Sequence, residues 1–284
     1  LAKKQRYLIP CTYHFYKDPP QIVRGQGLYL YDSTGKRYAD LYSGVSVHAL
    51  GHCHPEIVET ICRQVQTLQH TTTIYLTEPI VNLAERLAGV LPGKICRTFF
   101  CCSGSEANEG AALLATLHTG RNEFLAFANG LHGRTKLTMS LTGLAFWRTD
   151  PHPVGGITHV PPPYCGRCPF GQTYGSCRFE CVAAVESAIL TATSGRPAAM
   201  FVEPIQGNGG IIVPPPQYYP KLREILDKYH TLLIADEVQT GFGRTGKMFA
   251  MEHWDVMPDI ITGGKAIGGG TPVGFFSTTD EIAA

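Results

Sequence analysis

Lys265 stands alone among glycines in the stretch DIITGGKAIGGG, which covers residues 259–270. An apolar, glycine-rich environment favours the neutral amine of a lysine and makes that amine nucleophilic. The stretch lacks the GxxxxGK[ST] spacing of a nucleotide-binding loop, so a phosphate grip of that kind is excluded. A lone lysine is ordinarily a solvated surface charge, and its role here therefore depends on the chemistry that lies beside it.

Two other motifs that could do chemistry each come at the end of an apolar run. CCSGSEANEG (101–110) opens a helix, where the amides and hydroxyls of Ser103, Gly104 and Ser105 suit a phosphate. The alternative is an ordinary helix cap with Ser105 as the N-cap residue. Asp236 ends the run LLIAD, and a buried aspartate there needs a cationic or protonated partner. A salt bridge to a nearby arginine would serve equally well.

These three parts together are what pyridoxal 5'-phosphate requires of a protein: an anion cradle, a carboxylate for the pyridine nitrogen and a lysine for the Schiff base. The stretch 241–246 also fits the GxGxxG fingerprint of dinucleotide-binding proteins. The residues that follow it, KMFAMEHW, open no clear phosphate-binding helix, so we discount that fingerprint.

The elements that must position these residues alternate along the chain. Short strands that are apolar throughout (RTFFCC, EFLAFA, AAMFVEPI, TLLIADEV and DIITG) are separated by helical stretches such as SEANEGAALLATLHT. This pattern predicts an α/β fold with a mainly parallel sheet sandwiched by helices, and ligands at the carboxyl ends of its strands. We expect an N-terminal segment with a β-hairpin over 1–50, and a large cofactor domain over 51–284 with an irregular cysteine-rich insertion at 151–181.

Composition excludes several classes of protein. The 284 residues carry a net charge of +1, which gives no electrostatic footprint for nucleic acid or an anionic membrane. No run of about 18 apolar residues and no secretory leader is visible. Ten cysteines in a chain of this length suggest buried thiols in a reducing cytoplasm rather than a disulfide scaffold.

The motifs GHCHPEI, SGSEANE, HGRT, VEPIQGNGG, ADEVQTGFGRTG and DIITGGKAIGGGTPVG occur in an order that resembles the class III pyridoxal-phosphate aminotransferases of fold type I. The resemblance implies a homodimer with shared active sites. It also implies a reaction that moves an amino group from an amino acid or ω-amine to pyruvate, glyoxylate or 2-oxoglutarate.

The resemblance further implies roles for individual residues. Lys265 would hold the cofactor and move a proton, Asp236 would pair with the pyridine nitrogen, and Glu203 would lie at the cofactor end of the pocket. The other implied cofactor contacts are Ser103, Gly104, Ser105, Leu131, His132, Val238 and Gln239, and the implied substrate contacts are Val45, Tyr75 and Arg134.

Three features depart from the family pattern. Leu131 replaces the usual aromatic residue that covers the ring, which removes about 0.5 to 1.5 kcal/mol of aromatic contact. Asn208 replaces the glutamate of ornithine and γ-aminobutyrate enzymes, and Val45 replaces a tyrosine of ornithine enzymes. The changes at Asn208 and Val45 weaken an ornithine or acetylornithine assignment and favour the alanine-glyoxylate or β-alanine-pyruvate branches. The chain also stops early, so we expect the C-terminal small domain to be missing and an isolated chain to be inactive.

Two sets of residues raise the question of a metal. Cys165, Cys168, Cys177 and Cys181 have a C-x2-C-x8-C-x3-C spacing, compatible with structural zinc or with reduced or paired thiols that tie a surface loop. For His48, His52 and His54 we prefer capping or packing beside the helix that Pro55 opens. We therefore assign no metal ligand.

Two further functions stay open at this point. A racemase or epimerase could use the same lysine and cofactor, because the α-carbon can be reprotonated directly. A non-catalytic fragment, or an interaction module stapled by zinc, would account for the early end and the cysteine cluster.

Overall fold

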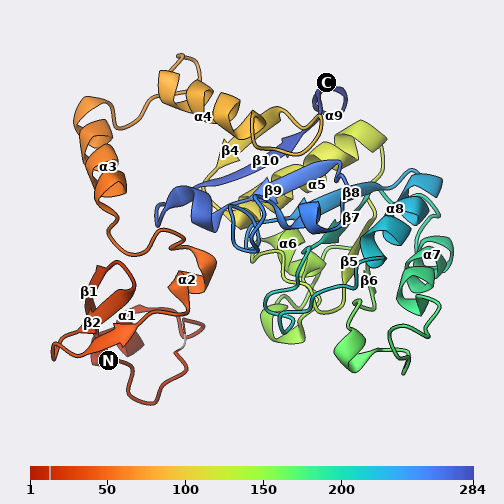
Figure 1. The fold of residues 1–284 in the computed structure, drawn as a ribbon, viewed down its shortest axis with the longest axis horizontal. Coiled ribbons are helices and arrows are strands. Elements are labelled where there is room, and N and C mark those ends of the chain that lie inside the picture. Colours follow the sequence, from red (N-terminus) through yellow and green to blue (C-terminus); the bar gives the residue numbers. More distant parts are fainter. Residues whose placement is uncertain (13) are drawn as a thin grey trace. The chain divides into compact units, whose positions relative to one another are not determined.

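The computed structural model describes residues 1–12 and 14–284, which form two compact units (Figure 1). The small unit comprises residues 1–43 and 50–70, and the large unit comprises 44–49 and 71–284. Residues 51–70, which the sequence analysis grouped with the large domain, cluster with the small unit instead.

The small unit contains the hairpin that the sequence predicts. Its elements are α1 (Ala2–Tyr7), β1 (Ile22–Gln26), β2 (Tyr29–Asp32), β3 (Arg37–Ala39) and α3 (Pro55–Thr67), with the strands in the antiparallel order β1-β2-β3. The Asp32 carboxylate accepts hydrogen bonds from the Thr34 hydroxyl at 2.7 Å, from the Tyr38 hydroxyl at 2.7 Å and from two backbone amides of the turn. These bonds, the Thr34 hydroxyl foremost, lower the pKa of Asp32 to about 2.

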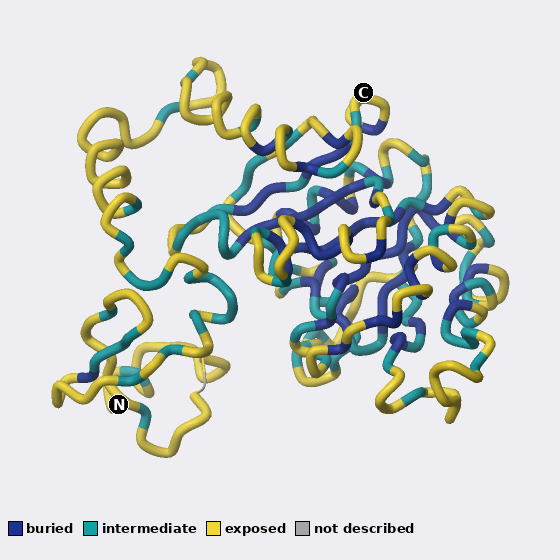
Figure 2. Tube along the Cα trace, viewed as in Figure 1, coloured by how far each residue is buried: buried dark blue, intermediate teal, exposed yellow. Residues whose placement is uncertain are grey.

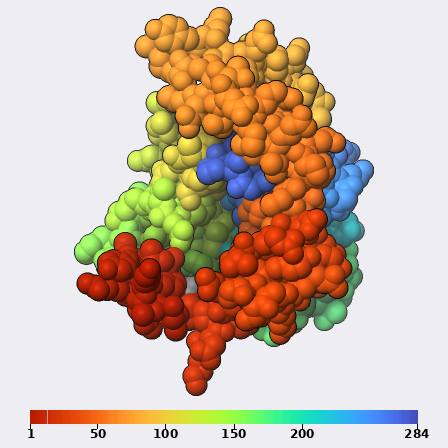
Figure 3. All heavy atoms as spheres, turned by 90° about the vertical axis from the view of Figure 1, so that its left-hand side faces the viewer, coloured from red at the N-terminus to blue at the C-terminus, as the bar shows by residue number. Residues whose placement is uncertain are grey.

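Helix α3 follows the hairpin and carries no buried residue. Val58, Ile61 and Val65 are each at least 39% exposed along one stripe of this helix, which is orange in Figure 3. At its N-terminus, His54 is the cap residue but makes no side-chain capping bond. His52 lies 2.7 Å from the Asp40 carboxylate through its Nε2 atom, a pairing that we did not foresee.

The large unit is built on a seven-stranded sheet in the order β4-β10-β9-β8-β7-β5-β6. All neighbours are parallel except β10, which is antiparallel to both β4 and β9, so the prediction of a mainly parallel sheet is confirmed. Strand β6 falls inside the stretch 151–181, which is therefore not irregular throughout. The strands are β4 (Arg97–Cys101), β5 (Phe124–Phe127), β6 (Ile157–Val160), β7 (Ala199–Val202), β8 (Leu232–Asp236), β9 (Ile260–Gly263) and β10 (Gly274–Thr278).

Helices of this unit cover both faces of the sheet. They are α2 (Ser43–Ser46), which starts at the boundary between the units, α4 (Glu78–Ala88), α5 (Gly104–Thr119), α6 (Lys136–Leu141), α7 (Glu180–Ala192), α8 (Tyr218–Lys228) and α9 (Asp280–Ala283). Four 3-10 turns are η1 (Ala145–Trp147), η2 (Cys165–Arg167), η3 (Ala250–His253) and η4 (Lys265–Gly268). Among the described residues, no helix is both long and apolar enough to span a bilayer.

Alternation along the strands builds two hydrophobic clusters. In β5, Leu125 and Phe127 join the cluster that includes residues of α7 and α8, whereas Phe124 and Ala126 join the cluster that includes alanines of α5. Strands β7, β8 and β9 are almost wholly buried and form the dark-blue centre of this unit in Figure 2. Their continuous apolar sequences follow from burial on both faces.

Small residues bring α5 close to the sheet. Ala107, Ala111, Ala112 and Ala115 are at most 1% exposed, and α5 packs against β9 and β10. At Gly110, a Cβ atom would lie 2.2 Å from the Phe276 ring, so no larger residue fits there without a shift. This close approach fixes the N-terminus of α5 beside the carboxyl edge of the sheet.

Candidate active site

The structure brings the chemically active residues to one edge of the sheet. Asp236 is the last residue of β8, Glu203 directly follows β7, and Lys265 comes two residues after β9. The loop after β5 carries Leu131 and His132, and the loop after β4 carries Ser103. All these strands run in the same direction, so their carboxyl ends meet, as the sequence pattern predicts.

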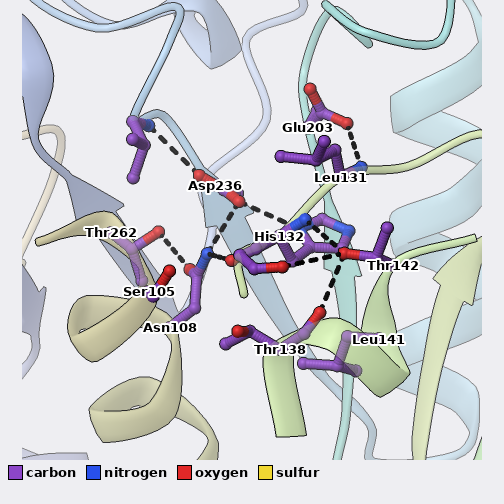
Figure 4. Close-up of polar contacts among 12 residues, drawn as sticks. Ser105, Asn108, Leu131, His132, Thr138, Leu141, Thr142, Glu203, Asp236 and Thr262 are labelled. Atoms are coloured by element: carbon purple, nitrogen blue, oxygen red, sulfur yellow. Dashed lines mark hydrogen bonds and ion pairs between the residues drawn. The ribbon is translucent and has the colours of Figure 1, made fainter. Parts of the chain in front are cut away.

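Asp236 is the centre of a buried hydrogen-bond network (Figure 4). Its Oδ2 atom accepts from Asn108 Nδ2 at 2.8 Å and lies 2.9 Å from His132 Nδ1, while its Oδ1 atom accepts from the Val238 amide at 3.2 Å. The residue is 4% exposed. Its partners are therefore an amide and an imidazole rather than the arginine of the salt-bridge alternative.

Thr262 determines which way the Asn108 amide faces. The Thr262 hydroxyl donates to Asn108 Oδ1 at 2.7 Å, which leaves the amide nitrogen to donate both to Asp236 and to the His132 carbonyl. Sequence reasoning missed this role of Asn108. Its position four residues after Gly104, in the stripe otherwise made of alanines, is a signal that could have identified it, because a polar side chain in a buried stripe needs a partner.

His132 contacts Asp236 through one ring nitrogen and, in the part of the chain that the structure describes, leaves the other unpaired. Its Nε2 atom is buried and has no hydrogen-bond partner within residues 1–12 and 14–284. Because an ionised carboxylate can only accept, the Nδ1 atom carries the hydrogen of the contact with Asp236.

Glu203 ties two loops of the site together. Its Oε1 atom accepts from the Leu131 amide at 2.7 Å and its Oε2 atom accepts from the Gly207 amide at 3.0 Å. Burial is the main cause that raises the pKa of Glu203 to about 7, and the neighbouring charge of Asp236 acts in the same direction. The carboxyl group can therefore exchange a proton near neutral pH.

Lys265 opens the turn η4 with a left-handed backbone, at φ 48°. Burial lowers the pKa of its amine, and the charges of Asp236 and Glu203 partly oppose this effect. The direction of this shift agrees with the sequence expectation of a desolvated lysine. The amine is thus poised for nucleophilic and proton-transfer chemistry.

Three glycines, Gly104, Gly207 and Gly264, which we call the glycine cradle, leave room for the residues that follow Asp236. A Cβ atom at Gly104 would lie 2.7 Å from a Val238 methyl group, and one at Gly264 would lie 3.5 Å from the same group. A Cβ atom at Gly207 would lie 2.5 Å from the Gln239 amide. Val238 therefore occupies space that a side chain at position 104 would need, whereas a Cβ atom at position 264 would make an ordinary contact with it.

The N-terminus of α5 is capped by Ser103, not by Ser105 as the capping alternative had it. The Ser103 hydroxyl accepts from the Glu106 amide at 3.2 Å, and the Ser105 hydroxyl accepts from the Arg134 amide at 3.1 Å. In the part of the chain that the structure describes, no hydrogen bond occupies the amides of Gly104 and Ser105. These amides remain available at the positive end of a 16-residue helix.

The three expected substrate contacts are placed unevenly. Val45 is half-buried, and its backbone is left-handed at φ 61°, an outlying conformation for a β-branched residue. Its segment reaches the lysine loop, because a Cβ atom at Gly270 would lie 3.1 Å from the His48 ring. The Arg134 side chain is exposed. Tyr75 is 66% exposed, and no contact described for residues 1–12 or 14–284 joins its side chain to the site.

The cysteines differ from expectation. All ten thiols are free, and each is exposed or half-buried, so the prediction of mostly buried thiols is wrong. Cys165, Cys168, Cys177 and Cys181 line one cavity of about 20 Å³ with a largely apolar wall. Within residues 1–12 and 14–284, no three histidine, cysteine or acidic side chains are grouped to hold a metal ion. The zinc alternative therefore finds no support in the geometry.

Comparison with protein families and curated proteins gives a consistent picture. The model of the family described as Aminotransferase class-III matches residues 15–284. The chain is 39% identical to the mitochondrial alanine–glyoxylate aminotransferase 2 homolog 2 of Arabidopsis thaliana, over 100% of this chain and 58% of that protein. It is 42% identical to the acetylornithine aminotransferase of Mycolicibacterium smegmatis, over 91% of this chain and 61% of that protein.

Solved structures agree. A thermostable (S)-enantioselective omega-transaminase from Thermomicrobium roseum superposes with a TM-score of 0.92 at 34% identity, covering 99% of this chain and 66% of that chain. A transaminase from the marine bacterium Virgibacillus gives a TM-score of 0.90 at 31% identity, with 99% and 65% coverage. The chain thus spans less than two thirds of the length of the relatives that it matches.

Proposed function

Because the chain belongs to the class-III aminotransferase family, we propose that its site binds pyridoxal 5'-phosphate and transfers an amino group from an amino acid or ω-amine to an oxo acid. The observation that carries the proposal is the meeting of Lys265, Asp236 and Glu203 at the carboxyl edge of a fold type I sheet. Burial lowers the pKa of the Lys265 amine, and the charges of Asp236 and Glu203 partly oppose this effect.

The residues present fit the cofactor. Gly104 and Ser105 offer unpaired amides for the phosphate, and Ser103 lies beside them. Within residues 1–12 and 14–284, Asp236 Oδ1 accepts only the Val238 amide, at 3.2 Å, so it keeps acceptor capacity for a protonated ring nitrogen. Leu131 and Val238 would cover the ring faces, Gln239 would approach the phenolic oxygen, and His132 would act through Asp236. When bound, the cofactor supplies an electron sink for a negative charge on the α-carbon.

The side chains of this chain then divide the remaining work. The desolvated amine of Lys265 is the group that would form the covalent link and carry the proton. The amide of Asn108 and the Nδ1 atom of His132 hold the Asp236 carboxylate in place. Glu203, whose pKa is raised to about 7, can hold or release a proton beside this pair.

The substrate proposal is broader. We expect an oxo acid such as pyruvate, glyoxylate or 2-oxoglutarate as acceptor. The exposed, uncharged Asn208 and the half-buried Val45 favour the alanine-glyoxylate or β-alanine-pyruvate branches over ornithine. The relatives named above include both an alanine–glyoxylate and an acetylornithine enzyme, so a direct screen is needed. Arg134, exposed beside the Ser105 loop, is the proposed carboxylate contact.

A homodimer and a cytoplasmic location complete the proposal. Leu113 and Leu117 of α5 are 59% and 72% exposed, and Phe99 of β4 is 63% exposed while stacked on Phe276. Apolar side chains of this size on a surface favour association with a second copy.

The deciding experiment is a screen of amino donors against pyruvate, glyoxylate and 2-oxoglutarate with the cofactor-loaded protein. We expect oxo-acid formation that the Lys265→Ala variant loses together with the visible absorbance of the bound cofactor. Entry of solvent deuterium at the α-carbon without oxo-acid formation would instead indicate a racemase. Wild-type protein that binds no cofactor would support a non-catalytic piece.

A further inference from the structure

Glu237, the residue after Asp236, is a buried acid for which the proposed chemistry has no use. It is 0% exposed, and burial is the main cause that raises its pKa to about 7. A buried carboxyl group persists in a protein only when its hydrogen bonds compensate for the loss of water. Its contacts therefore show what it does.

Those contacts join the two ends of one irregular segment. The Glu237 carboxylate accepts from the Thr240 hydroxyl through Oε2, and from the Met251 amide at 2.9 Å through Oε1. Its backbone is held as well, because its amide donates to the Thr262 carbonyl of β9 at 2.9 Å and its carbonyl accepts from Gly241 at 2.9 Å. Residues 238–250 between these ends belong to no strand or α-helix.

This segment begins with the two residues that stand against the glycine cradle. Val238 is in contact range of Gly104 and Gly264, and Gln239 is in contact range of Gly207. These three neighbours are glycines. On the side of the glycine cradle, Val238 and Gln239 therefore meet backbone atoms and no side chain. The Asp236 carboxylate holds the Val238 amide at 3.2 Å, and the Glu237 carboxylate holds the chain on either side of the rest of the segment, at Thr240 and Met251.

We propose that Glu237 is a positioning residue, whose carboxylate clamps the two ends of segment 238–251 and thereby sets where Val238 and Gln239 stand against the glycine cradle. The inference rests on the proposed function in one respect: these two residues matter because they face the cofactor. It also makes the clamp sensitive to pH, because protonation of the Glu237 carboxylate removes one acceptor oxygen from these contacts. Asp236 and the neutral Tyr219 are the titratable groups that interact electrostatically with Glu237.

The first test measures the dissociation constant of pyridoxal 5'-phosphate for cofactor-free protein between pH 6 and pH 8. We expect Glu237→Ala to weaken binding about tenfold or more, since its support for Val238 and Gln239 is lost. Glu237→Gln keeps the shape and one acceptor, so it should restore most of the affinity at pH 8. It should also lack the part of the pH dependence that the wild type owes to Glu237.

The matched control is Glu252→Gln. Glu252 is an exposed acid directly after this segment, and its carboxylate caps η3 by accepting from the Phe249 amide at 2.7 Å. This variant removes a charge without touching the clamp, so its affinity and pH profile should follow the wild type. Thr240→Val removes one donor and should fall between Glu237→Ala and the wild type, which keeps the test open if the alanine variant does not fold.

The second test needs no cofactor. Trp254 is 8% exposed and its amide donates to the Met251 carbonyl at 3.1 Å, next to the clamped end of the segment. In a Trp147→Phe background, Trp254 is the one remaining tryptophan. Its fluorescence should change with pH around pH 7. The same background with Glu237→Gln should show no such transition.

The outcomes separate the two proposals. If the wild type binds no pyridoxal 5'-phosphate, the proposed function fails, and the Trp254 titration still decides the clamp. If the wild type binds it while folded Glu237→Ala has unchanged affinity, or Glu237→Gln keeps the wild-type pH profile, the clamp is overturned and the proposed function stands.

Discussion

Asn108 and Asp236 lie 128 residues apart in the chain and are joined by a buried hydrogen bond of 2.8 Å, from the amide nitrogen of one to the carboxylate of the other. Because Thr262 occupies the amide oxygen of Asn108, the donor faces the carboxylate in a fixed sense. Helix α5 thus supplies one of the hydrogen-bond donors that hold the carboxylate at the end of β8. This pair connects helix α5 to the residue that we assign to the cofactor ring.

Replacing Asn108 should weaken both folding and cofactor binding. A hydrogen bond to a buried charge contributes about 1.5 to 3 kcal/mol, so we expect Asn108→Ala to lower the free energy of unfolding by about that amount. Asn108→Asp should be worse, because it places a second carboxyl group against Asp236. Urea unfolding and cofactor titration would measure both effects. Asn122→Ala, a change at an exposed asparagine, is the control, and an equal loss there would remove the claim.

Gly104 should tolerate no side chain while Val238 is present. Gly104→Ala places a methyl group 2.7 Å from a Val238 methyl, and overpacking of this kind costs about 1 to 3 kcal/mol. We expect a corresponding loss of cofactor affinity and of thermal stability. Val238→Ala in the same chain should recover part of the stability, because it removes the colliding methyl groups.

The control for this pair is Gly155→Ala, where a Cβ atom would meet nothing within 4 Å. It should be close to neutral in the same thermal unfolding assay. A Gly104→Ala protein that Val238→Ala fails to improve would show that the collision is not what limits this site.

Glu203 should make the fold less stable as the pH rises. Its folded-state pKa of about 7 lies above the ordinary value of 4.5, so the folded protein binds more protons than the unfolded chain between these values. Stability from this group is therefore fully present below pH 4.5 and is lost as the pH rises through 7. Relative to Glu203→Gln, the wild type should lose up to about 3 kcal/mol between pH 5 and pH 8.

Urea unfolding of both proteins at several pH values gives this difference directly, since other titrating groups are common to the two. Two parallel profiles would mean that the carboxyl group is ionised throughout. The expected sign is opposite to that of an ordinary paired carboxylate.

Asp32 should behave in that ordinary way. Its pKa is lowered to about 2 by the hydroxyls of Thr34 and Tyr38 and by turn amides, so its contribution is present above pH 3.8 and is lost as the pH falls through 2. Asp32→Asn should loosen the β2–β3 hairpin at neutral pH and remove this acid-induced loss. Amide hydrogen exchange of Lys36 would report it, because that amide donates to the Asp32 carboxylate. Unchanged protection in the variant would rule out this role.

The sequence predicted the parts of the site that depend on strand ends. Asp236, Glu203 and Lys265 each follow an apolar run, and parallel strands necessarily gather such positions at one edge. The hydrogen-bond networks between residues far apart in the sequence could not be predicted from it. Asn108 and Glu237 acquire their partners only through the packing of α5 on β9 and through the return of the chain at Met251, which no local pattern records.

Two other differences have the same origin. Strand β6 has only four residues, Ile157–Val160. Because prolines and cysteines follow it, the sequence pattern indicated an irregular insertion there instead of a strand. The cysteine exposures depend on which face of each element meets the core. His52 and Asp40 meet because the small unit folds back on itself, which spacing in the sequence does not show.

The placement of β10 sets an order of events during synthesis. Among the strands that the structure describes, β4, which leads into the Ser103 loop, hydrogen-bonds only to β10, and β10 in turn joins it to β9. Residues 97–101 therefore have no strand partner until residues 274–278 have left the ribosome. Non-local pairing of this kind forms late, since the intervening chain must first be closed into a loop. Lys265 and Asp236 can be neighbours early, but the side of the site that holds the α5 amides is aligned only when β10 pairs with both β4 and β9.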